Sequence, residues 1–212
     1  MRYIIYGAGG IGGTIGARLF HRGHDVVLIC RGDHLKIIQD KGLTLKIPQE
    51  TFQLAIPAVG HPGEIAFSTD DVVLLTMKSQ DTEMALRDLE RPGGSDLAVI
   101  CGQNGVDNER MAARRFSSVY GMVVWMPATY LEPGLVLNHA QSIGGILDAG
   151  CYPHGIDPLI TQVTYDLTQC GFNAKPDPNI MRWKYTKLLS NVRNAFQAVC
   201  GFDARSRKLV HA

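Results

Sequence analysis

Four polar side chains near the carboxyl end of the sequence have a spacing suited to carbonyl chemistry. Lys184, Lys187, Asn191 and Asn194 follow one another at intervals of three, four and three residues. A helix would place them on one face. A lysine ammonium can protonate a carbonyl oxygen as hydride reaches the carbonyl carbon, and asparagine amides can bind a carboxylate or a hydroxyl. The alternative interpretation of this spacing is a polar helix face in contact with solvent.

A glycine-rich stretch near the amino terminus has the spacing of a dinucleotide-binding turn. It reads Gly7-Ala8-Gly9-Gly10-Ile11-Gly12, after the apolar run Arg2–Tyr6 and before a helical pattern from Ile11 to about Arg22. The second apolar run, Asp25–Cys30, completes a βαβ unit, and this context makes the motif far more specific than GxGxxG alone.

Each glycine of this motif has a physical role. Gly7 would permit a tight turn, Gly9 would let a pyrophosphate approach the backbone, and Gly12 would let the helix pack against the strand. The helix start would add free N–H groups and the positive end of its dipole. An ordinary βα turn that happens to be rich in glycine is the alternative.

The end of the second apolar run indicates which dinucleotide is bound. NAD sites usually place an acidic residue there for the ribose 2′-hydroxyl, whereas this sequence has Cys30 followed by Arg31. A guanidinium can pair with a 2′-phosphate, so we predict NADP(H) as the cofactor. Asp33 lies close in the sequence, and its negative charge would disfavour a 2′-phosphate. The alternative interpretation of Arg31 is a surface arginine at the start of the next helix.

Lys78 and Asn104 each come directly after a predicted buried strand, Asp71–Met77 and Leu97–Cys101 respectively. Ligands of parallel α/β sheets bind beyond the carboxyl ends of the strands. Lys78 could contact a phosphate or carboxylate, and Asn104 could contact the cofactor or the substrate. The alternatives are a solvated lysine and an asparagine that only forms a turn with Gly105.

Composition sets limits on function. The 212 residues are 45% hydrophobic and carry a net charge of +1, which gives no support for a nucleic-acid partner. No apolar run approaches the roughly 18 residues of a membrane span, and a strand that begins at residue 2 leaves no signal peptide. Scattered cysteines without CxxC spacing predict neither a metal site nor a disulfide framework and favour the cytoplasm; they are Cys30, Cys101, Cys151, Cys170 and Cys200.

Strands and helices alternate through the first half of the sequence, which predicts a doubly wound α/β sheet of the Rossmann type. Beyond Ser118 the pattern becomes β-rich and predicts an antiparallel or mixed extension of that sheet. The other expected strands are Leu43–Ile47, Phe52–Val59, Val119–Ala128, Leu135–His139 and Ile143–Leu147, and the other expected helices are His34–Lys41, Thr82–Leu89, a segment ending near Arg115, and Asp157–Thr168.

The run Lys175-Pro176-Asp177-Pro178 predicts a domain boundary, with a nucleotide-binding domain at 1–175 and the start of a helical domain at 178–212. Asn179–Val199 lacks internal glycine and proline and predicts one long helix. Its apolar side chains would form one buried stripe; they are Ile180, Trp183, Leu188, Val192, Phe196 and Val199.

Together these segments resemble the ketopantoate reductase family, the 2-dehydropantoate 2-reductases. The resemblance is carried by the glycine-rich stretch, Arg31, Thr76-Met77-Lys78, Gln103-Asn104-Gly105, and the segment from Trp183 to Asn191. It implies a Rossmann domain followed by an all-helical domain, and reduction of an α-keto acid with NADPH in pantothenate biosynthesis. It also implies that Lys187 is the general acid, that Asn191 binds substrate, and that Lys78 and Asn104 lie at the cofactor and substrate.

Two features depart from the family pattern. The family's second asparagine lies eight residues after the catalytic lysine, where this sequence has Ala195, and Asn194 is the nearest substitute. Family members run to roughly 300 residues, a two-domain size, so the helices that complete the cleft, with their substrate-binding serine and glutamate, are expected to be missing. The stripe around Trp183 and Phe196 would then need a partner, and a second copy of the chain, docked through this helix, is a candidate.

The leading hypothesis is therefore NADPH-dependent reduction of 2-dehydropantoate or a close analogue. One alternative is a non-catalytic NADP(H)-binding module. The other is a reductase of the same fold for a different 2-keto acid, which the Asn194 and Ala195 departure keeps open.

Overall fold

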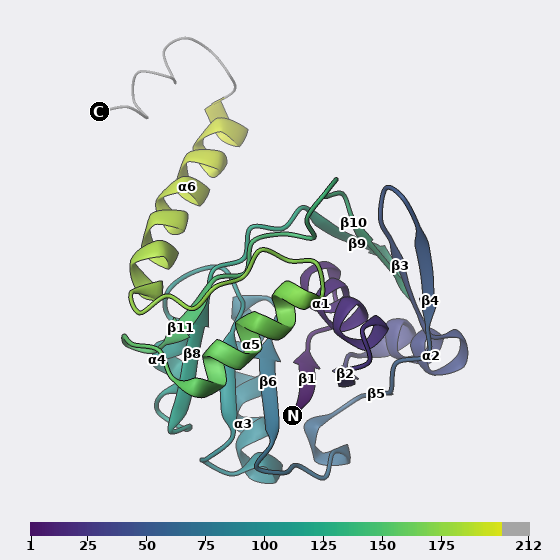
Figure 1. The fold of residues 1–212 in the computed structure, drawn as a ribbon, viewed down its shortest axis with the longest axis horizontal. Helices are drawn as coiled ribbons and strands as arrows, with labels where there is room; N and C mark the ends of the chain where they lie inside the picture. The colour runs from purple at the N-terminus through teal and green to yellow at the C-terminus, as the bar shows by residue number, and fades with distance from the viewer. Residues whose placement is uncertain (201–212) are drawn as a thin grey trace.

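A seven-stranded sheet contains the amino-terminal βαβ unit (Figure 1). The computed structural model describes the backbone of residues 1–200 and the side chains of residues 1–192. In spatial order the strands are β11 (Ala149–Cys151), β8 (Ser118–Met122), β7 (Ala98–Cys101), β6 (Asp71–Leu75), β1 (Arg2–Tyr6), β2 (Asp25–Ile29) and β5 (Ala58–Val59). All neighbouring pairs are parallel except β8 with β11. The predicted doubly wound Rossmann-type fold is confirmed.

Helices cover both faces of this sheet because alternate strand residues point to opposite sides. Tyr3 and Ile5 of β1 share a core with α1 (Gly10–His21) and α5 (Pro158–Gln169). Ile4 and Tyr6 belong to the core on the other face, which α3 (Thr82–Gly93) and α4 (Asn108–Ala112) cover. α2 (Gly32–Lys41) follows β2, and short 3-10 turns occupy Pro62–Glu64 and Ser79–Asp81.

The β-rich part of the sequence builds a second sheet rather than only extending the first. Its strands, in spatial order, are β4 (Thr51–Leu54), β3 (Leu43–Lys46), β10 (Leu135–Asn138) and β9 (Ala128–Glu132). This sheet packs on α1, where a Cβ at Gly13 would lie 2.8 Å from Val136. The glycines of α1 therefore have two roles: some line the cavity described below, and others let the second sheet pack close to the helix.

Three predicted strands were wrong in extent. Phe52–Val59 divides into β4 and β5, which belong to different sheets, because Pro57 interrupts the ladder between them. Val119–Ala128 divides into β8 and β9, with Pro127 just before the second strand. Ile143–Leu147 forms only isolated bridges at Ile146, since Gly144 and Gly145 precede it, and the strand at this edge is β11.

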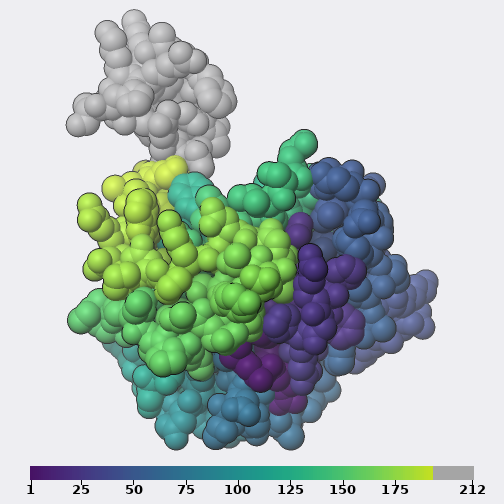
Figure 2. All heavy atoms as spheres, viewed as in Figure 1, coloured from purple at the N-terminus to yellow at the C-terminus, as the bar shows by residue number. Residues whose placement is uncertain are grey.

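The long helix α6 (Ile180–Cys200) rises from the β8 and β11 edge of the main sheet (Figure 1). Ile180 is fully buried, and it fits because Gly121 of β8 and Gly150 of β11 leave space for its side chain. The predicted buried stripe continues only in part: Trp183 and Val192 are 53% and 60% exposed. The part of α6 that the structure describes lies at the upper left of the molecule (Figure 2). Phe196 and Val199 lie outside the described side chains.

Within residues 1–200, no helix is both long enough and apolar enough to cross a membrane.

Candidate functional site

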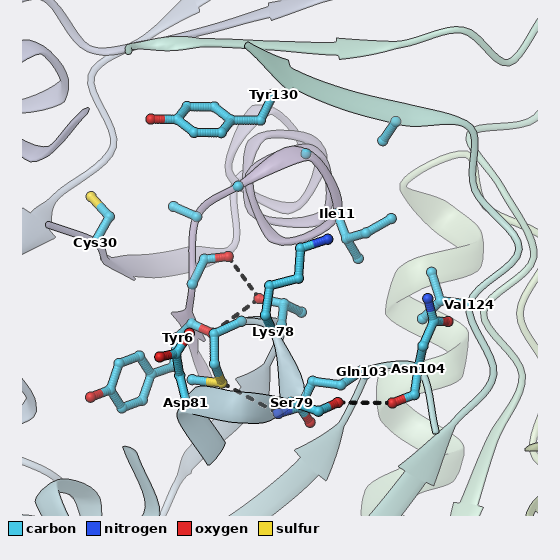
Figure 3. Close-up of a pocket in the computed structure, with 18 of the residues that line it drawn as sticks. Tyr6, Ile11, Cys30, Lys78, Ser79, Asp81, Gln103, Asn104, Val124 and Tyr130 are labelled. Atoms are coloured by element: carbon cyan, nitrogen blue, oxygen red, sulfur yellow. Dashed lines mark hydrogen bonds between the residues drawn. The ribbon is translucent and has the colours of Figure 1, made fainter. Parts of the chain in front are cut away.

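A cavity of about 600 Å³ lies at the carboxyl ends of β1, β2, β6 and β7 (Figure 3). Residues far apart in the sequence line it together: the glycine-rich turn, the segments after β2, β6 and β7, the chain from Val124 to Tyr130, and Lys187 of α6. Cys30 and Asn104 lie toward opposite sides of the view in Figure 3, with Lys78 between them. The structure therefore places the predicted residues Arg31, Lys78, Asn104 and Lys187 around one space.

The glycine-rich turn has the geometry that its sequence predicts. Gly7 has φ +104°, and a Cβ there would lie 2.6 Å from the backbone nitrogen of Met77, so a larger residue would not fit. A Cβ at Gly12 would collide with the Gly7 carbonyl and the Thr76 hydroxyl. Gly9 is different, because no atom lies within 4 Å of its Cβ position. The backbone at Gly9 thus faces open space that a ligand can enter.

The start of α1 offers hydrogen-bond donors to this space. Gly9 and Ala8 line the cavity beside Gly10 and Ile11, and Gly12 packs behind them. The Gly13 amide donates to the Gly9 carbonyl at 2.7 Å, so the helical ladder begins there. The three preceding amides are the free N–H groups of a helix start, which suit a phosphate.

Arg31 lies at the β2 end of the cavity, next to Cys30 and Tyr6. Its side chain is exposed, whereas the Tyr6 hydroxyl is buried without a hydrogen-bond partner among the described residues. Burial raises the pKa of Tyr6, and a side-chain interaction with Arg31, together with the charge of Arg31, opposes that shift, so the two groups are close although their geometry is not that of a formed hydrogen bond. Asp33 does not line the cavity and instead pairs with Lys36 at 3.1 Å. An anion beside Arg31 would therefore meet a cation and an available hydroxyl.

Hydrogen bonds fix the loop that carries Asn104. The Ser79 hydroxyl donates to the Asn104 backbone carbonyl at 3.1 Å (Figure 3). The side-chain amide of Asn108 donates to the same carbonyl at 3.1 Å. Buried Gln103 donates to the Thr82 hydroxyl at 2.8 Å. The contacts of Ser79 and Asn108 use the backbone carbonyl of Asn104, so its side chain can turn toward the cavity. Lys78, at the end of β6, is exposed and projects across the cavity in Figure 3.

Lys187 reaches the cavity from α6. Its ammonium donates to the side-chain oxygen of Asn104 at 2.9 Å and to the carbonyl of Val124, and it lies 5.1 Å from the ring centroid of Trp125. Burial, with a smaller contribution from the charge of Lys184, lowers the pKa of Lys187 to about 8. A lysine held in this way can release its proton near neutral pH, as a general acid must.

The other polar residues of α6 are placed less uniformly than their spacing suggests. Asn191 lies next to Lys187 and Asn104, where it lines a small recess beside the main cavity. The Asn194 side chain lies outside those that the structure describes. Lys184 is only 4% exposed and does not line the main cavity.

Sequence reasoning missed the role of Lys184. Its ammonium donates to the carbonyls of Cys101 and Gln103, both at 3.0 Å, and forms an ion pair with Glu109 of α4. Glu109 is fully buried, and its pKa is raised because burial outweighs the attraction of Lys184. Lys184 thus joins α6 to α4 through the ion pair and to the segment that precedes Asn104 through the two carbonyls. No local signal could have found it, because 75 residues separate the partners, from 109 to 184.

His34 is a second residue that the sequence did not single out. It is 6% exposed, lines the cavity, and contacts both the Ala8 carbonyl and the Gly134 amide. Its only sequence signal is its position three residues after Arg31. Tyr130 lies against its ring, with centroids 4.7 Å apart.

Comparison with known proteins gives the family. The family model for ketopantoate reductase PanE/ApbA matches residues 3–153. The chain is 30% identical over 194 residues to the 2-dehydropantoate 2-reductase of Pyrococcus horikoshii, covering 90% of this chain and 61% of that protein. It therefore spans about three fifths of the length of this curated relative.

Solved structures agree in fold. The 2-dehydropantoate 2-reductase of Geobacter metallireducens GS-15 superposes with a TM-score of 0.87 at 25% identity, over 99% of this chain and 71% of that one. A D-mandelate dehydrogenase, solved with NADH and anilino(oxo)acetate, shares the fold with a TM-score of 0.86 at 23% identity, over 99% of this chain and 70% of that one. Because the family model matches most of the chain, this chain belongs to the ketopantoate reductase PanE/ApbA family.

Proposed function

We propose that the protein reduces the keto group of a 2-keto acid with NADPH, and that 2-dehydropantoate is the first substrate to test. The main observation behind this proposal is that the Lys187 ammonium lies 2.9 Å from the side-chain oxygen of Asn104. Both residues line the same cavity as the glycine-rich turn at the start of α1. The 2-dehydropantoate 2-reductases among its relatives support the choice of substrate.

The cavity fits a dinucleotide phosphate. Open space over Gly9, free amides at the start of α1, and the buried Tyr6 hydroxyl beside Arg31 are each suited to phosphate oxygens. Gly7–Gly12 would hold the pyrophosphate, Arg31 the 2′-phosphate, and Lys78 and Asn104 the part nearest the substrate. When bound, the reduced nicotinamide would supply the hydride.

Lys187 would supply the proton. Its ammonium is held by Asn104 and Val124, so one N–H can turn to the substrate's carbonyl oxygen while the others stay bonded. The oxygen becomes a hydroxyl, and the resulting neutral amine takes a proton from water. Asn191 and Asn194, on the same helix, would bind the substrate's carboxylate or hydroxyl.

Oxidation of NADPH, followed by absorbance, tests this function with 2-dehydropantoate and with other 2-keto acids in parallel. Turnover with 2-dehydropantoate would support the leading substrate. Preference for another keto acid would support a reductase of the same fold with a different substrate. That alternative is open because Ala195 stands where the family pattern has an asparagine. Binding of NADPH without turnover of any keto acid would instead favour a non-catalytic NADP(H)-binding module.

Replacing Arg31 with glutamate should weaken NADPH binding by about tenfold to a hundredfold, the scale of one or two lost charge-assisted hydrogen bonds. NADH lacks the 2′-phosphate, so its affinity should change much less. Fluorescence titrations with both dinucleotides check this. Lys36→Glu is the matched control, since Lys36 is an exposed cation of α2 that does not line the cavity. Equal losses for NADPH and NADH would contradict the assigned role of Arg31.

We also propose that the exposed apolar side chains of α6 mediate self-association. Leu189 and Val192, three residues apart on one face of α6, are 73% and 60% exposed, and Trp183 elsewhere on the helix is 53% exposed. Exposed apolar side chains of this size favour a partner. Sedimentation velocity should show a dimer that Leu189→Glu converts to monomer. A monomer at every concentration tested would rule this out.

A further inference from the structure

His34 connects three elements around the cavity. It lies in the first turn of α2, three residues after Arg31. One ring nitrogen, Nε2, lies 2.7 Å from the carbonyl oxygen of Ala8 in the glycine-rich turn. The other, Nδ1, accepts a hydrogen bond at 2.8 Å from the Gly134 amide, in the turn between β9 and β10.

These contacts determine where the His34 proton lies. The Gly134 amide can only donate, so Nδ1 must be the unprotonated nitrogen and Nε2 must carry the hydrogen. Burial lowers the pKa of His34, which keeps the ring neutral at neutral pH. His34 therefore presents one fixed donor, and that donor points at Ala8.

The Ala8–Gly9 peptide is a group whose orientation matters for binding. Ala8 is buried in the core, whereas no atom lies within 4 Å of the Cβ position of Gly9, so packing fixes this peptide from the Ala8 side alone. Its N–H donates to the Gly7 carbonyl at 2.8 Å, and its carbonyl accepts from His34. If this peptide turned over, the Ala8 carbonyl oxygen would face the space beside the free amides of α1, where it would repel an anion.

We propose that His34 is a positioning residue for the dinucleotide: its hydrogen bond to the Ala8 carbonyl holds the glycine-rich turn in the orientation that receives the pyrophosphate. This rests on the proposed NADPH function. Both ring nitrogens are occupied by backbone groups, so His34 acts through Ala8 rather than by touching the ligand.

Two amide variants separate the two hydrogen bonds of His34. The amide nitrogen of glutamine can reach the place of Nε2, so His34→Gln keeps a donor for Ala8. The amide oxygen of asparagine can reach the place of Nδ1, so His34→Asn keeps an acceptor for Gly134 and loses the donor. The experiment is NADPH and NADH titration of both variants and the wild type, with denaturant unfolding of each in parallel.

His34→Asn should bind both dinucleotides about tenfold more weakly, the scale of one lost buried hydrogen bond and a misplaced carbonyl. His34→Gln should bind them within about threefold of the wild type, and the preference for NADPH over NADH should be unchanged in both variants. Weakening that follows unfolding stability instead, or equal affinity in the two variants, would overturn the role of His34. A wild-type chain that is folded and binds neither dinucleotide would overturn the proposed function, and this inference with it.

Discussion

Replacing Lys187 with alanine should lower the turnover of keto acid by roughly two to four orders of magnitude, the usual contribution of a general acid. NADPH affinity should stay close to that of the wild type, because Lys187 lies at the Asn104 end of the cavity, away from the glycine-rich turn. Steady-state kinetics and a dinucleotide titration, performed on the same preparation, separate the two effects. Near-normal turnover in Lys187→Ala would exclude Lys187 as the proton donor.

The pH dependence of turnover tests more specifically whether Lys187 is the proton donor. Burial lowers the pKa of Lys187 to about 8, and a general acid must be protonated, so turnover in the wild type should fall as pH rises through about 8. The residual activity of Lys187→Ala should lack this fall. Arg182→Ala is the matched control, an exposed cation on the same helix, and it should keep both the rate and the profile of the wild type.

Replacing Lys184 with methionine should destabilise the fold by about 3–5 kcal/mol, because it leaves the fully buried carboxyl of Glu109 without its cation. The carbonyls of Cys101 and Gln103 would also lose their donor. Denaturant unfolding with a two-state fit measures the loss. The same substitution at Lys36, which is exposed and pairs with the exposed Asp33, should change stability little.

A double variant tests the cause of that loss. Glu109→Leu together with Lys184→Met removes both buried charges, and it should recover much of the stability that Lys184→Met loses. If the double variant is as unstable as the single one, lost packing of the lysine stem rather than the orphaned carboxylate would explain the result. An unchanged midpoint in Lys184→Met would show that the buried pair contributes nothing.

The amino-terminal half was predictable because its signals are local. Apolar runs such as Asp71–Leu75 become fully buried strands, and the glycine-rich turn requires glycine at the positions where the backbone approaches itself most closely. The β-rich segment was harder. Whether a short strand joins one sheet or another depends on partners distant in sequence, as β4 and β5 show on either side of Pro57.

The site was predictable as a set of residue types, and its geometry was not. Lys187 and Asn104 are 83 residues apart, and only the fold shows that they share a hydrogen bond. Lys184 has the spacing of a residue on the active face, yet it is buried in an ion pair with Glu109. The exposure of Trp183 could not be predicted either, because the helical pattern marks an apolar face and does not say what covers it.

The central claim, that this cavity holds NADPH, is tested most directly by titrating the folded wild-type chain with NADPH and following fluorescence. We predict saturable binding to one site per chain, tighter for NADPH than for NADH, and lost in Gly12→Val, whose side chain would collide with the Gly7 carbonyl and with Thr76. Circular dichroism of both proteins confirms folding. A folded wild-type chain that binds neither dinucleotide, or a folded Gly12→Val that binds as well as the wild type, would contradict the account.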